Sequence, residues 1–394
     1  MTIDEVRTVL FVGAGTMGCA NSLVAAVAGY DVVLHDARPE NLDAVPHRHD
    51  EIAAFLVEVG FCSPDDVTAA RERVTLAADL HEAVANADLV SESVFEDLDL
   101  KRNVHRALDQ AAPRHTVLTT NTSALLVSDI EDIVERGDRF AAMHSHLGAL
   151  LVDIVGGPRT SPATVDLLRR YVESLGAIPL VLKKEHPGYV FNAMNGPVLS
   201  AATELLLDGI ADAETIDRTW MADRGAPMGP FGMMDLFGLD LVRDSWRRPT
   251  TDPGQEVSSD RDTLRARAVP FLTELVEAGR LGLKSGQGFY DYPGPAFQDP
   301  AFLTAAPTSP VVSDALRSAL IASAVELAAQ DVASPEDIDM AWMAATGQEL
   351  GPFGIMEQLG VDHFLSILDE EADAGLLSPE VARFAADYLA VRPT

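Results

Sequence analysis

The first half of the chain alternates short runs of aliphatic and β-branched residues with amphipathic stretches. This alternation predicts βαβ units around a parallel sheet, and therefore an α/β class. Turn and cap signals agree, because Ser161 can cap a helix, Pro162 suits its first position and Gly176 can end it. The predicted strands are residues 8–12, 31–35, 87–91, 116–120, 140–144, 150–155 and 178–182.

Strand signals stop after the His-Pro-Gly sequence at 186–188, and helical periodicity follows, for example at 198–207 and 264–278. The segment 294–310 is rich in proline and small residues, which is typical of a linker. We therefore predict an α/β domain at 1–184, a helical domain at 185–293 and a second helical domain at 311–394.

The helical part repeats itself at an offset of 122 residues. The 27 residues from Ile216 align with the 27 from Ile338, and 13 positions are identical, including Trp-Met-Ala and Gly-Pro-Phe-Gly. This match indicates a duplication, and the period is too long for a solenoid array. We expect two related all-helical domains. The second carries Asp314 where the first carries Asn192, so we expect it to be degenerate and to lack an active site.

Composition narrows the class of protein. Hydrophobic residues make up 47% and charged residues 23%, which excludes a mainly disordered chain. No window is apolar enough for a membrane span, and the start lacks the basic residues of a signal peptide, so we expect a cytoplasmic protein. Cys19 and Cys62 are too few for a disulfide framework. The net charge of −32 would repel nucleic acid and anionic membranes, so we expect neither as a partner.

The sequence Gly-Ala-Gly-Thr-Met-Gly at 13–18 follows the first predicted strand and opens a helical stretch. In this context it predicts a dinucleotide site. Gly13 permits the tight turn, Gly15 lets a pyrophosphate approach the backbone, and Gly18 lets the helix pack on the strand. Thr16 and Met17 lie within this turn and are expected to bind the cofactor with it, and the N-terminal amides of the following helix attract the phosphates.

Asp36 follows the second predicted strand, 18 residues after Gly18. A carboxylate there accepts hydrogen bonds from the adenosine ribose and repels a 2′-phosphate, which favours NAD over NADP. Arg38 weakens this preference. The alternative is a glycine turn inside an α/β core without any cofactor.

These motifs together make the chain resemble the 3-hydroxyacyl-CoA dehydrogenase family, with its gulonate dehydrogenase and lambda-crystallin branch. The resemblance covers nearly the whole chain. It implies a Rossmann-like domain followed by a helical domain, NAD as cofactor, and an oxidoreductase of fatty acid metabolism that transfers a hydride between NAD and a 3-hydroxyacyl thioester or 3-hydroxy acid. The second helical copy resembles the doubled C-terminal domain of some members. Besides the glycine turn, the matching segments are ADLVSESVFEDLDLK at 87–101, NTSAL at 121–125, FAAMH at 140–144, HPGYVFN at 186–192, GAPMGPFGMMDLFGLD at 225–240 and LGLKSGQGFYDYP at 281–293.

The resemblance also implies roles for single residues. His144 matches the family's catalytic base, and an imidazole of near-neutral pKa suits that role. Ser123 and Asn192 match substrate contacts that can hold a developing alkoxide. Glu96 and Lys101 match residues near the nicotinamide end of the cofactor.

Each of these roles has a structural alternative. Ser123 and Asn121 could cap the helix after the fifth predicted strand, and Asn192 could be a buried helix residue bonded to backbone. Glu96 and Lys101 could form a solvated helix face.

The chain departs from the family pattern directly after His144. The usual Asn-Pro is absent, the connection to the next strand is about three residues shorter, and the acid expected to orient the histidine is Asp153 rather than glutamate. Aspartate is shorter by one carbon–carbon bond of about 1.5 Å, so the hydrogen bond needs a closer backbone. The shortened loop is a candidate source of that movement.

His146 adds a second imidazole that could act as base, bind substrate or face solvent. With His144 and Asp153 it resembles a metal triad, but neither the spacing nor the family supports one, and we expect no metal. The charged residues 47–50 are expected to be solvated.

The substrate is less determined than the chemistry. Residues 41–66 contain no lysine, whereas many acyl-CoA members carry a basic helical segment there, so a smaller hydroxy acid is an alternative. Two other functions stay open: an NAD-binding protein that has lost catalysis and serves a structural or sensing role, and a ketoreductase acting on a carrier-bound acyl chain. We expect a small-molecule substrate. We also expect a monomer or homodimer, because the second helical copy can occupy the dimer interface within one chain.

Overall fold

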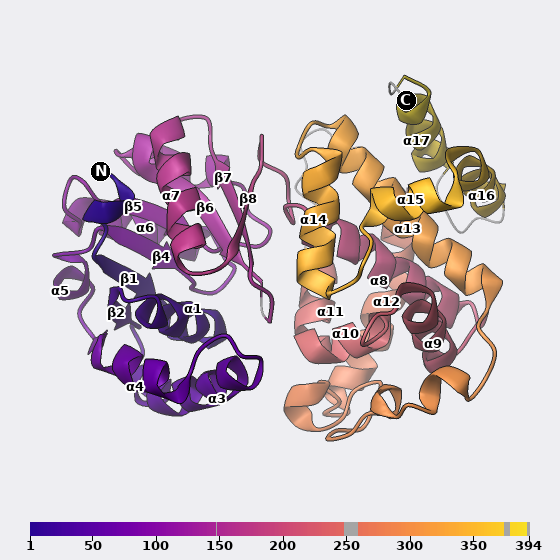
Figure 1. Ribbon diagram of the computed structural model, residues 1–394, viewed down its shortest axis with the longest axis horizontal. Helices are drawn as coiled ribbons and strands as arrows, with labels where there is room; N and C mark the ends of the chain where they lie inside the picture. The colour runs from indigo at the N-terminus through magenta and orange to yellow at the C-terminus, as the bar shows by residue number, and fades with distance from the viewer. Residues whose placement is uncertain (147, 248–258, 374–378, 392–394) are drawn as a thin grey trace. The chain divides into compact units, whose positions relative to one another are not determined.

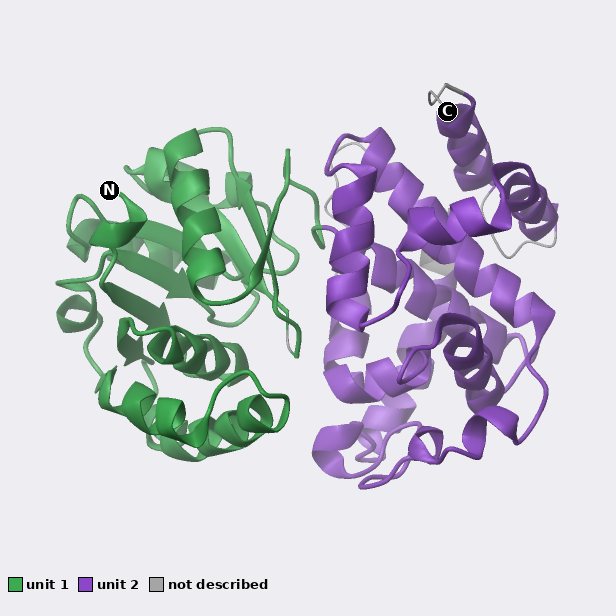
Figure 2. Cartoon of the chain, in the orientation of Figure 1, with its two compact units in different colours: residues 1–189 green, residues 190–394 purple. Residues whose placement is uncertain are grey.

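The structure, a computed structural model, describes residues 1–146, 148–247, 259–373 and 379–391. It divides into two compact units, residues 1–189 and 190–394, which Figure 2 colours separately. Leu147, in the loop predicted to be shortened, lies outside the described residues. Within the described ranges, every helix is too short or too polar to cross a membrane.

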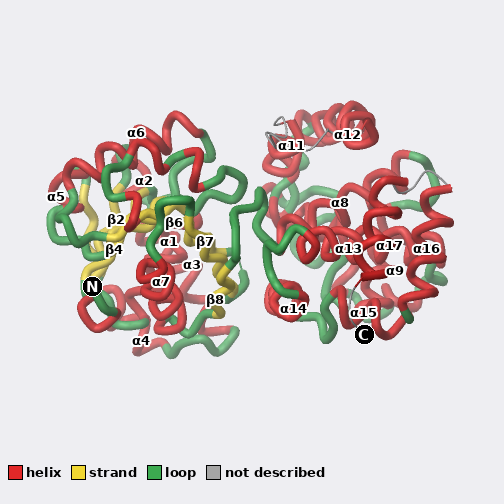
Figure 3. The backbone as a smooth tube through the Cα atoms, turned by 90° about the horizontal axis from the view of Figure 1, so that it is seen from above, coloured by secondary structure: helices red, strands yellow, loops and turns green. Residues whose placement is uncertain are grey.

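The first unit is built on an eight-stranded sheet with helices on both faces (Figures 1 and 3). The strand order is β3-β2-β1-β4-β5-β6-β7-β8, and the class predicted from the sequence is confirmed. The strands are β1 (Thr8–Val12), β2 (Asp31–His35), β3 (Val74–Ala77), β4 (Leu89–Glu92), β5 (Val117–Thr120), β6 (Phe140–Ser145), β7 (Leu151–Gly156) and β8 (Ile178–Val181). The helices are α1 (Thr16–Val27), α2 (Pro39–Asp43), α3 (Val45–Glu58), α4 (Pro64–Glu72), α5 (Leu80–Val84), α6 (Leu98–Ala111) and α7 (Pro162–Ser174).

All seven predicted strands are present, and the caps predicted for α7 are found: Ser161 accepts the backbone N–H of Thr164, and Gly176 has a φ of +75°. Strand β3 was missed because none of its residues is buried, so it carries no continuous apolar run. The expected parallel pairing holds for every neighbouring pair of strands except β6 and β7, which are antiparallel. Their connection is too short for the crossover that parallel strands require.

The regular elements in the described part of the second unit are helices, and two isolated β-bridges lie among residues 282–291 (Figure 1). Its helices are α8 (Phe191–Leu207), α9 (Ala213–Arg224), α10 (Pro230–Phe237), α11 (Leu239–Arg247), α12 (Ser259–Glu277), α13 (Pro310–Ala329), α14 (Pro335–Thr346), α15 (Pro352–Leu359), α16 (Val361–Asp373) and α17 (Pro379–Val391). The proline-rich segment predicted as a linker packs on these helices, because Phe297 and Phe302 are buried and Arg218 Nε donates to the Phe302 carbonyl at 2.7 Å. The domain boundaries drawn from the sequence remain predictions.

The internal repeat is visible as equivalent helices. Helices α9, α10 and α11 begin 122 residues before α14, α15 and α16, and the equivalent helices α8 and α13 pack against each other. The rings of Trp220 and its equivalent Trp342 meet edge to face at 6.3 Å. A residue that contacts its own equivalent lies near a two-fold axis. The two helical repeats therefore pair with each other within the chain.

An aspartate in each copy holds the start of the next helix. Asp217 accepts the backbone N–H groups of Phe231 and Gly232, both at 2.9 Å, at the start of α10. Asp339 accepts the equivalent pair at 2.8 and 2.9 Å at the start of α15. A Cβ atom on the glycine before either helix, Gly229 or Gly351, would lie 2.4 Å from the Cα of that aspartate. This contact explains why aspartate and Gly-Pro-Phe-Gly recur together.

We predict that Asp217→Ala destabilises the helical unit more than Asp339→Ala does. Asp217 is fully buried and also accepts the Tyr290 hydroxyl at 2.9 Å, so its loss strands three donors and should cost about 3 kcal/mol. Asp339 is only half-buried and acts as a helix cap, worth about 1 kcal/mol. All three tryptophans lie in the second unit, so the urea midpoint followed by tryptophan fluorescence reports this unit alone.

The matched control is Asp4→Ala, an exposed change in the first unit, which should leave the tryptophan midpoint unchanged. Equal midpoints for the two cap variants would show that burial of Asp217 adds nothing.

Candidate functional site

The candidate site lies at the carboxyl ends of four strands that are neighbours in the sheet, β1, β4, β5 and β6. Parallel pairing brings these ends to one edge, where open α/β sheets bind their ligands. Most of the residues predicted from the sequence follow directly from these ends.

The glycine turn leaves β1 and opens α1. Gly13 has a φ of +103°, and a Cβ atom there would lie 2.6 Å from the carbonyl oxygen of Ser93. A Cβ on Gly18 would lie 1.7 Å from the Gly13 carbonyl oxygen, so the turn itself, more than the strand, requires this glycine. A Cβ on Gly15 would meet nothing within 4 Å. Gly15 offers no side-chain cap to the first amides of α1, including Thr16 and Met17, so they remain suited to a phosphate.

Asp36 follows β2 and faces this turn. Its carboxylate accepts the Ala14 N–H at 2.9 Å, the Arg38 N–H at 2.9 Å and the Asn41 side-chain amide at 3.0 Å. Burial raises the pKa of Asp36, but these donors outweigh burial and hold it below its usual range. The group is therefore ionised at neutral pH, as ribose recognition requires.

Two residues of α3 contribute contacts that sequence reasoning missed. Arg48 Nη1 donates to the Ala14 carbonyl of the glycine turn, and His49 is buried with its Nε2 3.1 Å from the Ser22 hydroxyl of α1. The expectation that residues 47–50 are solvated is wrong for these two, although His47 and Asp50 are exposed. The helical period of α3 could have indicated this, because residues 47 and 50 share one face of the helix and residues 48 and 49 point away from it.

A buried charge network fixes the end of β4. Lys101 Nζ donates to Glu92 Oε1 at 2.8 Å, and His105 Nε2 lies 3.1 Å from Glu92 Oε2. Burial raises the pKa of Glu92, yet Lys101 and His105 outweigh it and lower this pKa to about 2. The side chain of Lys101 is only 1% exposed, so the alternative of a solvated helix face is wrong for Lys101.

Glu96 organises the segment after β5. Its Oε1 accepts the Thr122 hydroxyl and the backbone N–H groups of Ser123 and Ala124 at 3.0 and 2.9 Å, while Oε2 lies 3.4 Å from Lys101 Nζ. The next helical turn, Val127–Asp129, has Leu126 as its N-cap. The alternative in which Ser123 caps that helix is therefore wrong.

His144 and Asp153 stand directly opposite each other in the antiparallel pair of β6 and β7. His144 Nδ1 lies 3.1 Å from Asp153 Oδ2. Direct opposition brings the two backbones as close as a sheet allows, so the shorter acid reaches the ring. The end of β6 is tied to β5, because the side-chain oxygen of Asn121 accepts the Ser145 N–H at 2.8 Å.

His146 shares the same carboxylate oxygen. Its Nε2 lies 2.7 Å from Asp153 Oδ2, its ring meets His144 edge to face at 4.5 Å, and its side chain is 6% exposed, so it does not face solvent. Burial, assisted by the neighbouring His146, holds the pKa of His144 below its usual value, although Asp153 opposes this. Burial raises the pKa of Asp153, but its two imidazole contacts outweigh burial and lower it. The site therefore presents a neutral His144 beside an ionised acid.

Tyr189 is a further residue that the sequence analysis missed. Its ring stacks on His144 at 4.9 Å with an interplanar angle of 25°, and its hydroxyl donates to the Thr122 carbonyl at 2.8 Å. Tyr189 has a φ of +55°, which is uncommon for a residue with a bulky side chain. It fixes the plane of the imidazole.

Asn192 lies in the first turn of α8, in the second unit, and is half-buried. Its place in a helix agrees with the structural alternative, and its role as a substrate contact stays a prediction. The first unit by itself gathers the other predicted residues along one sheet edge, namely Gly13, Gly15, Thr16, Met17, Gly18, Asp36, Glu96, Lys101, Ser123, His144 and Asp153.

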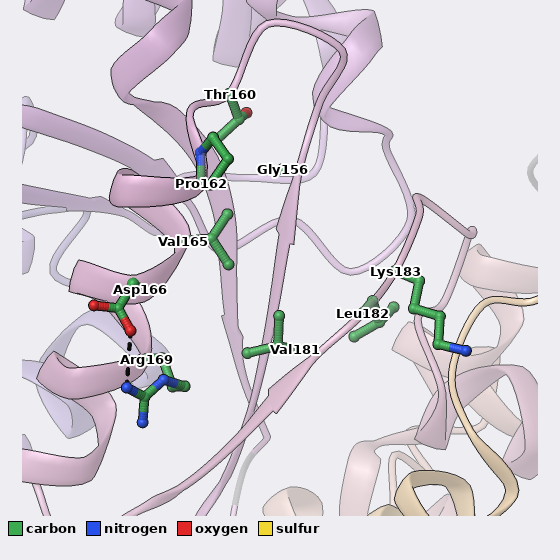
Figure 4. A pocket seen from close by; sticks show the side chains of 9 residues that line it. All are labelled: Gly156, Thr160, Pro162, Val165, Asp166, Arg169, Val181, Leu182 and Lys183. Carbon is green, nitrogen blue, oxygen red and sulfur yellow. Dashed lines mark hydrogen bonds and ion pairs between the residues drawn. The ribbon is translucent and has the colours of Figure 1, made fainter.

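A groove of about 480 Å³ lies elsewhere in the first unit, beside α7 and β8 (Figure 4). Two cations, Arg169 and Lys183, line the groove, and Arg169 is paired with Asp166 at 2.8 Å. None of the predicted site residues lines it. The groove is therefore separate from the candidate site.

Comparison with known proteins identifies the family. The model of the 3-hydroxyacyl-CoA dehydrogenase NAD binding domain matches residues 8–186, and that of the C-terminal domain matches 188–292 and 312–386. A Bacillus subtilis protein named probable 3-hydroxybutyryl-CoA dehydrogenase is 31% identical over 291 residues, which are 73% of this chain and 98% of that protein. The mitochondrial hydroxyacyl-coenzyme A dehydrogenase of Homo sapiens is 30% identical over 298 residues, 73% of this chain and 91% of that protein.

Solved structures agree. A diketoreductase described by its dual catalysis of dicarbonyl compounds is 35% identical, with a TM-score of 0.65 over 73% of this chain and 99% of that one. The 3-hydroxybutyryl-CoA dehydrogenase of Escherichia coli covers 98% of this chain and 100% of its own with a TM-score of 0.78, and at 22% identity it shows the fold alone. The chain therefore belongs to the 3-hydroxyacyl-CoA dehydrogenase family, and its first unit is the NAD-binding domain of that family.

Proposed function

We propose that the protein is an NAD-dependent oxidoreductase that interconverts a 3-hydroxyacyl thioester or 3-hydroxy acid with its 3-oxo form. The observation that carries the proposal is the buried His144–Asp153 pair, which lies on the same sheet edge as the glycine turn. An oriented imidazole beside a dinucleotide site is what reversible hydride transfer from an alcohol requires.

In the proposed mechanism His144 is the general base. Asp153 accepts from Nδ1 and so keeps the proton on that nitrogen, which leaves the Nε2 lone pair for the substrate hydroxyl. When bound, NAD supplies the hydride acceptor. His144 takes the hydroxyl proton as the alcohol is oxidised and returns it in the reverse direction, while Asp153 stabilises the imidazolium that forms. Tyr189 holds the ring plane throughout.

The remaining predicted residues have supporting roles in this proposal. Ser123 holds the developing alkoxide by a hydrogen bond, and Asn192 keeps the role of substrate contact predicted from the sequence. Glu96 positions Ser123 through its backbone N–H, and Lys101 holds Glu96 in turn. Lys101 and Glu96 therefore position the segment after β5 that lies near the nicotinamide in this proposal.

The nature of the acyl carrier is the finer part of the proposal. Relatives named for CoA substrates support a CoA thioester. A second candidate substrate is a dicarbonyl compound without CoA. Residues 41–66 contain no lysine to bind CoA phosphates, and Arg48 instead donates to the glycine turn. The 35% identical diketoreductase is described as acting on dicarbonyl compounds.

The two free cysteines, Cys19 and Cys62, support a reducing compartment, and we propose the cytoplasm.

Nicotinamide absorbance with a panel of 3-hydroxyacyl-CoA thioesters, free 3-hydroxy acids, gulonate and dicarbonyl compounds tests this function. We expect turnover on at least one of them. His144→Gln should lower kcat by at least about a hundred-fold, the usual contribution of a general base, while the Kd for NAD stays within about two-fold. His146→Gln, measured in parallel, should lose less than His144→Gln does.

Tight NAD binding without turnover of any compound would instead support a structural or sensing protein. A larger loss in His146→Gln would move the role of base to His146. Turnover of carrier-bound acyl chains alone would support the ketoreductase alternative.

We predict that Asp36→Asn shifts cofactor preference toward NADP. The ionised carboxylate and a 2′-phosphate about 4 Å away repel each other by about 1 to 4 kcal/mol. Removing that charge should therefore change the ratio of kcat/KM for NADP over NAD by at least about ten-fold. Steady-state rates with each cofactor provide the measurement. Asp43→Asn, an exposed change at the end of α2, is the matched control and should leave the ratio unaltered.

We also propose that the protein is a monomer or homodimer in solution. The equivalent helices α8 and α13 already pack together within one chain, and so do the equivalent Trp220 and Trp342. The surface through which one helical repeat could pair with a second chain is therefore already covered by the other repeat of the same chain. Sedimentation or light scattering at micromolar concentration should give the mass of one or two chains, and an obligate tetramer would contradict the proposal.

A further inference from the structure

The carboxylate of Asp153 is the meeting point of two imidazoles. One ring nitrogen of His144, one of His146 and a carboxylate oxygen of Asp153 lie within 4.8 Å of one another, and no other trio of histidine, cysteine or acidic side chains in the described ranges meets this criterion. Two imidazole nitrogens and one carboxylate oxygen form a ligand set that Zn²⁺ and related transition ions take, often with a fourth position left for water.

The cluster is built and enclosed. Asp153 is fully buried, and the side chains of His144 and His146 are 7% and 6% exposed. Both imidazoles contact Oδ2 of Asp153, whereas its Oδ1 is buried and has no hydrogen-bond partner among the described residues. A buried carboxylate oxygen without a donor is unfavourable, and a cation would satisfy it.

The two spacings between an imidazole and the carboxylate are near those of a bound ion, and the two ring nitrogens, which lie within 4.8 Å of each other, would settle at a similar distance. Bonds of about 2.0 to 2.2 Å in a tetrahedral site separate ligand atoms by about 3.4 Å. The 3.1 Å between His144 and Asp153 is close to this value. The 2.7 Å between His146 and Asp153 would have to open by about 0.7 Å, and His146 lies just beyond the last residue of β6, where the backbone is not held by the ladder.

The other histidine–carboxylate ion pairs among the described residues lack this combination, and one of them, His47 with Glu51, is largely exposed. His115 faces Asp88 as a lone imidazole with half of its side chain exposed. His105 faces Glu92, but Lys101 lies 2.8 Å from the same carboxylate and would repel a cation. In the described part of the chain Asp153 forms ion pairs with imidazoles only.

We propose that His144, His146 and Asp153 form a binding site for a Zn²⁺-class ion, and that this ion reversibly inhibits the enzyme. The ion would bond to His144 Nδ1, His146 Nε2 and Asp153. Each neutral ring then keeps its single hydrogen on the other nitrogen, so no proton is lost or gained. For His144 that nitrogen is Nε2, the atom that must accept the substrate proton. The inhibition therefore rests on the proposed function, whereas the binding does not.

Direct metal binding is the first test. The full chain, freed of metal with a chelator, is titrated with Co²⁺, which should give the visible absorption of a tetrahedral site at one ion per chain, and Zn²⁺ should displace it. His146→Gln removes one ligand and should weaken Zn²⁺ binding by at least about ten-fold, the lower end of what altered metal surroundings cost. His115→Gln, the matched control, should bind Zn²⁺ as the unaltered chain does.

The rate under Zn²⁺ is the second test. Because the ion sits at Nδ1, behind the reacting nitrogen, Zn²⁺ should lower kcat without raising the KM for NAD, and a chelator should restore the rate. In His146→Gln the Zn²⁺ concentration for half-inhibition, taken relative to that variant's own metal-free rate, should rise at least about ten-fold.

Absence of a tetrahedral Co²⁺ spectrum, or equal Zn²⁺ affinity in His146→Gln and the unaltered chain, would overturn the site. Binding without any change in kcat for an active substrate would overturn the inhibition. If no substrate is turned over, the proposed function fails, and the Co²⁺ titration still decides the site on its own.

Discussion

The hydrogen bond between His144 and Asp153 is the contact on which the rest of the site depends. Its geometry comes from backbone register, because β6 and β7 are antiparallel and place the two residues directly opposite each other. A register shift of one residue would send the two side chains to opposite faces of the sheet. The register of β6 against β7 is therefore what lets the aspartate reach the ring.

The position of that ring relative to the cofactor turn is set by buried charges. Lys101 contacts Glu92 and Glu96, and these two acids hold the ends of β4 and the segment after β5. A buried ion pair adds little net stability to the fold. Removing one partner is nevertheless costly, because the other charge is then buried without compensation, so the two side chains stay paired. Asn121 and Tyr189 then connect this segment to β6 and to the imidazole. These contacts connect the ends of β4, β5 and β6, which are distant in the sequence, along one edge of the sheet.

Features that depend on a few neighbouring residues could be predicted from the sequence. Strand positions, the caps of α7, the glycine turn and Asp36 all follow from periodicity or from the steric needs of a turn. The residues missed, Arg48, His49 and Tyr189, act through contacts between elements that no local pattern specifies. Strand β3 was missed for the opposite reason, because its half-exposed residues give no apolar run. The role of His146 stayed open because both its burial and its partner depend on the register of β7.

In the repeated helical part the contacts that hold helices recur in both copies, whereas the predicted substrate contact occurs in one. Asp217 and Asp339 hold equivalent helix starts with the same two backbone bonds, and the equivalent tryptophans still meet. At the position equivalent to Asn192, however, the second copy carries Asp314, which is paired with Arg317 at 2.5 Å. A carboxylate engaged by a guanidinium is a poor substitute for an amide that holds an alkoxide, because its own charge repels the oxyanion. The second copy has therefore kept the residues that hold helices together and lost the one that the proposed chemistry needs.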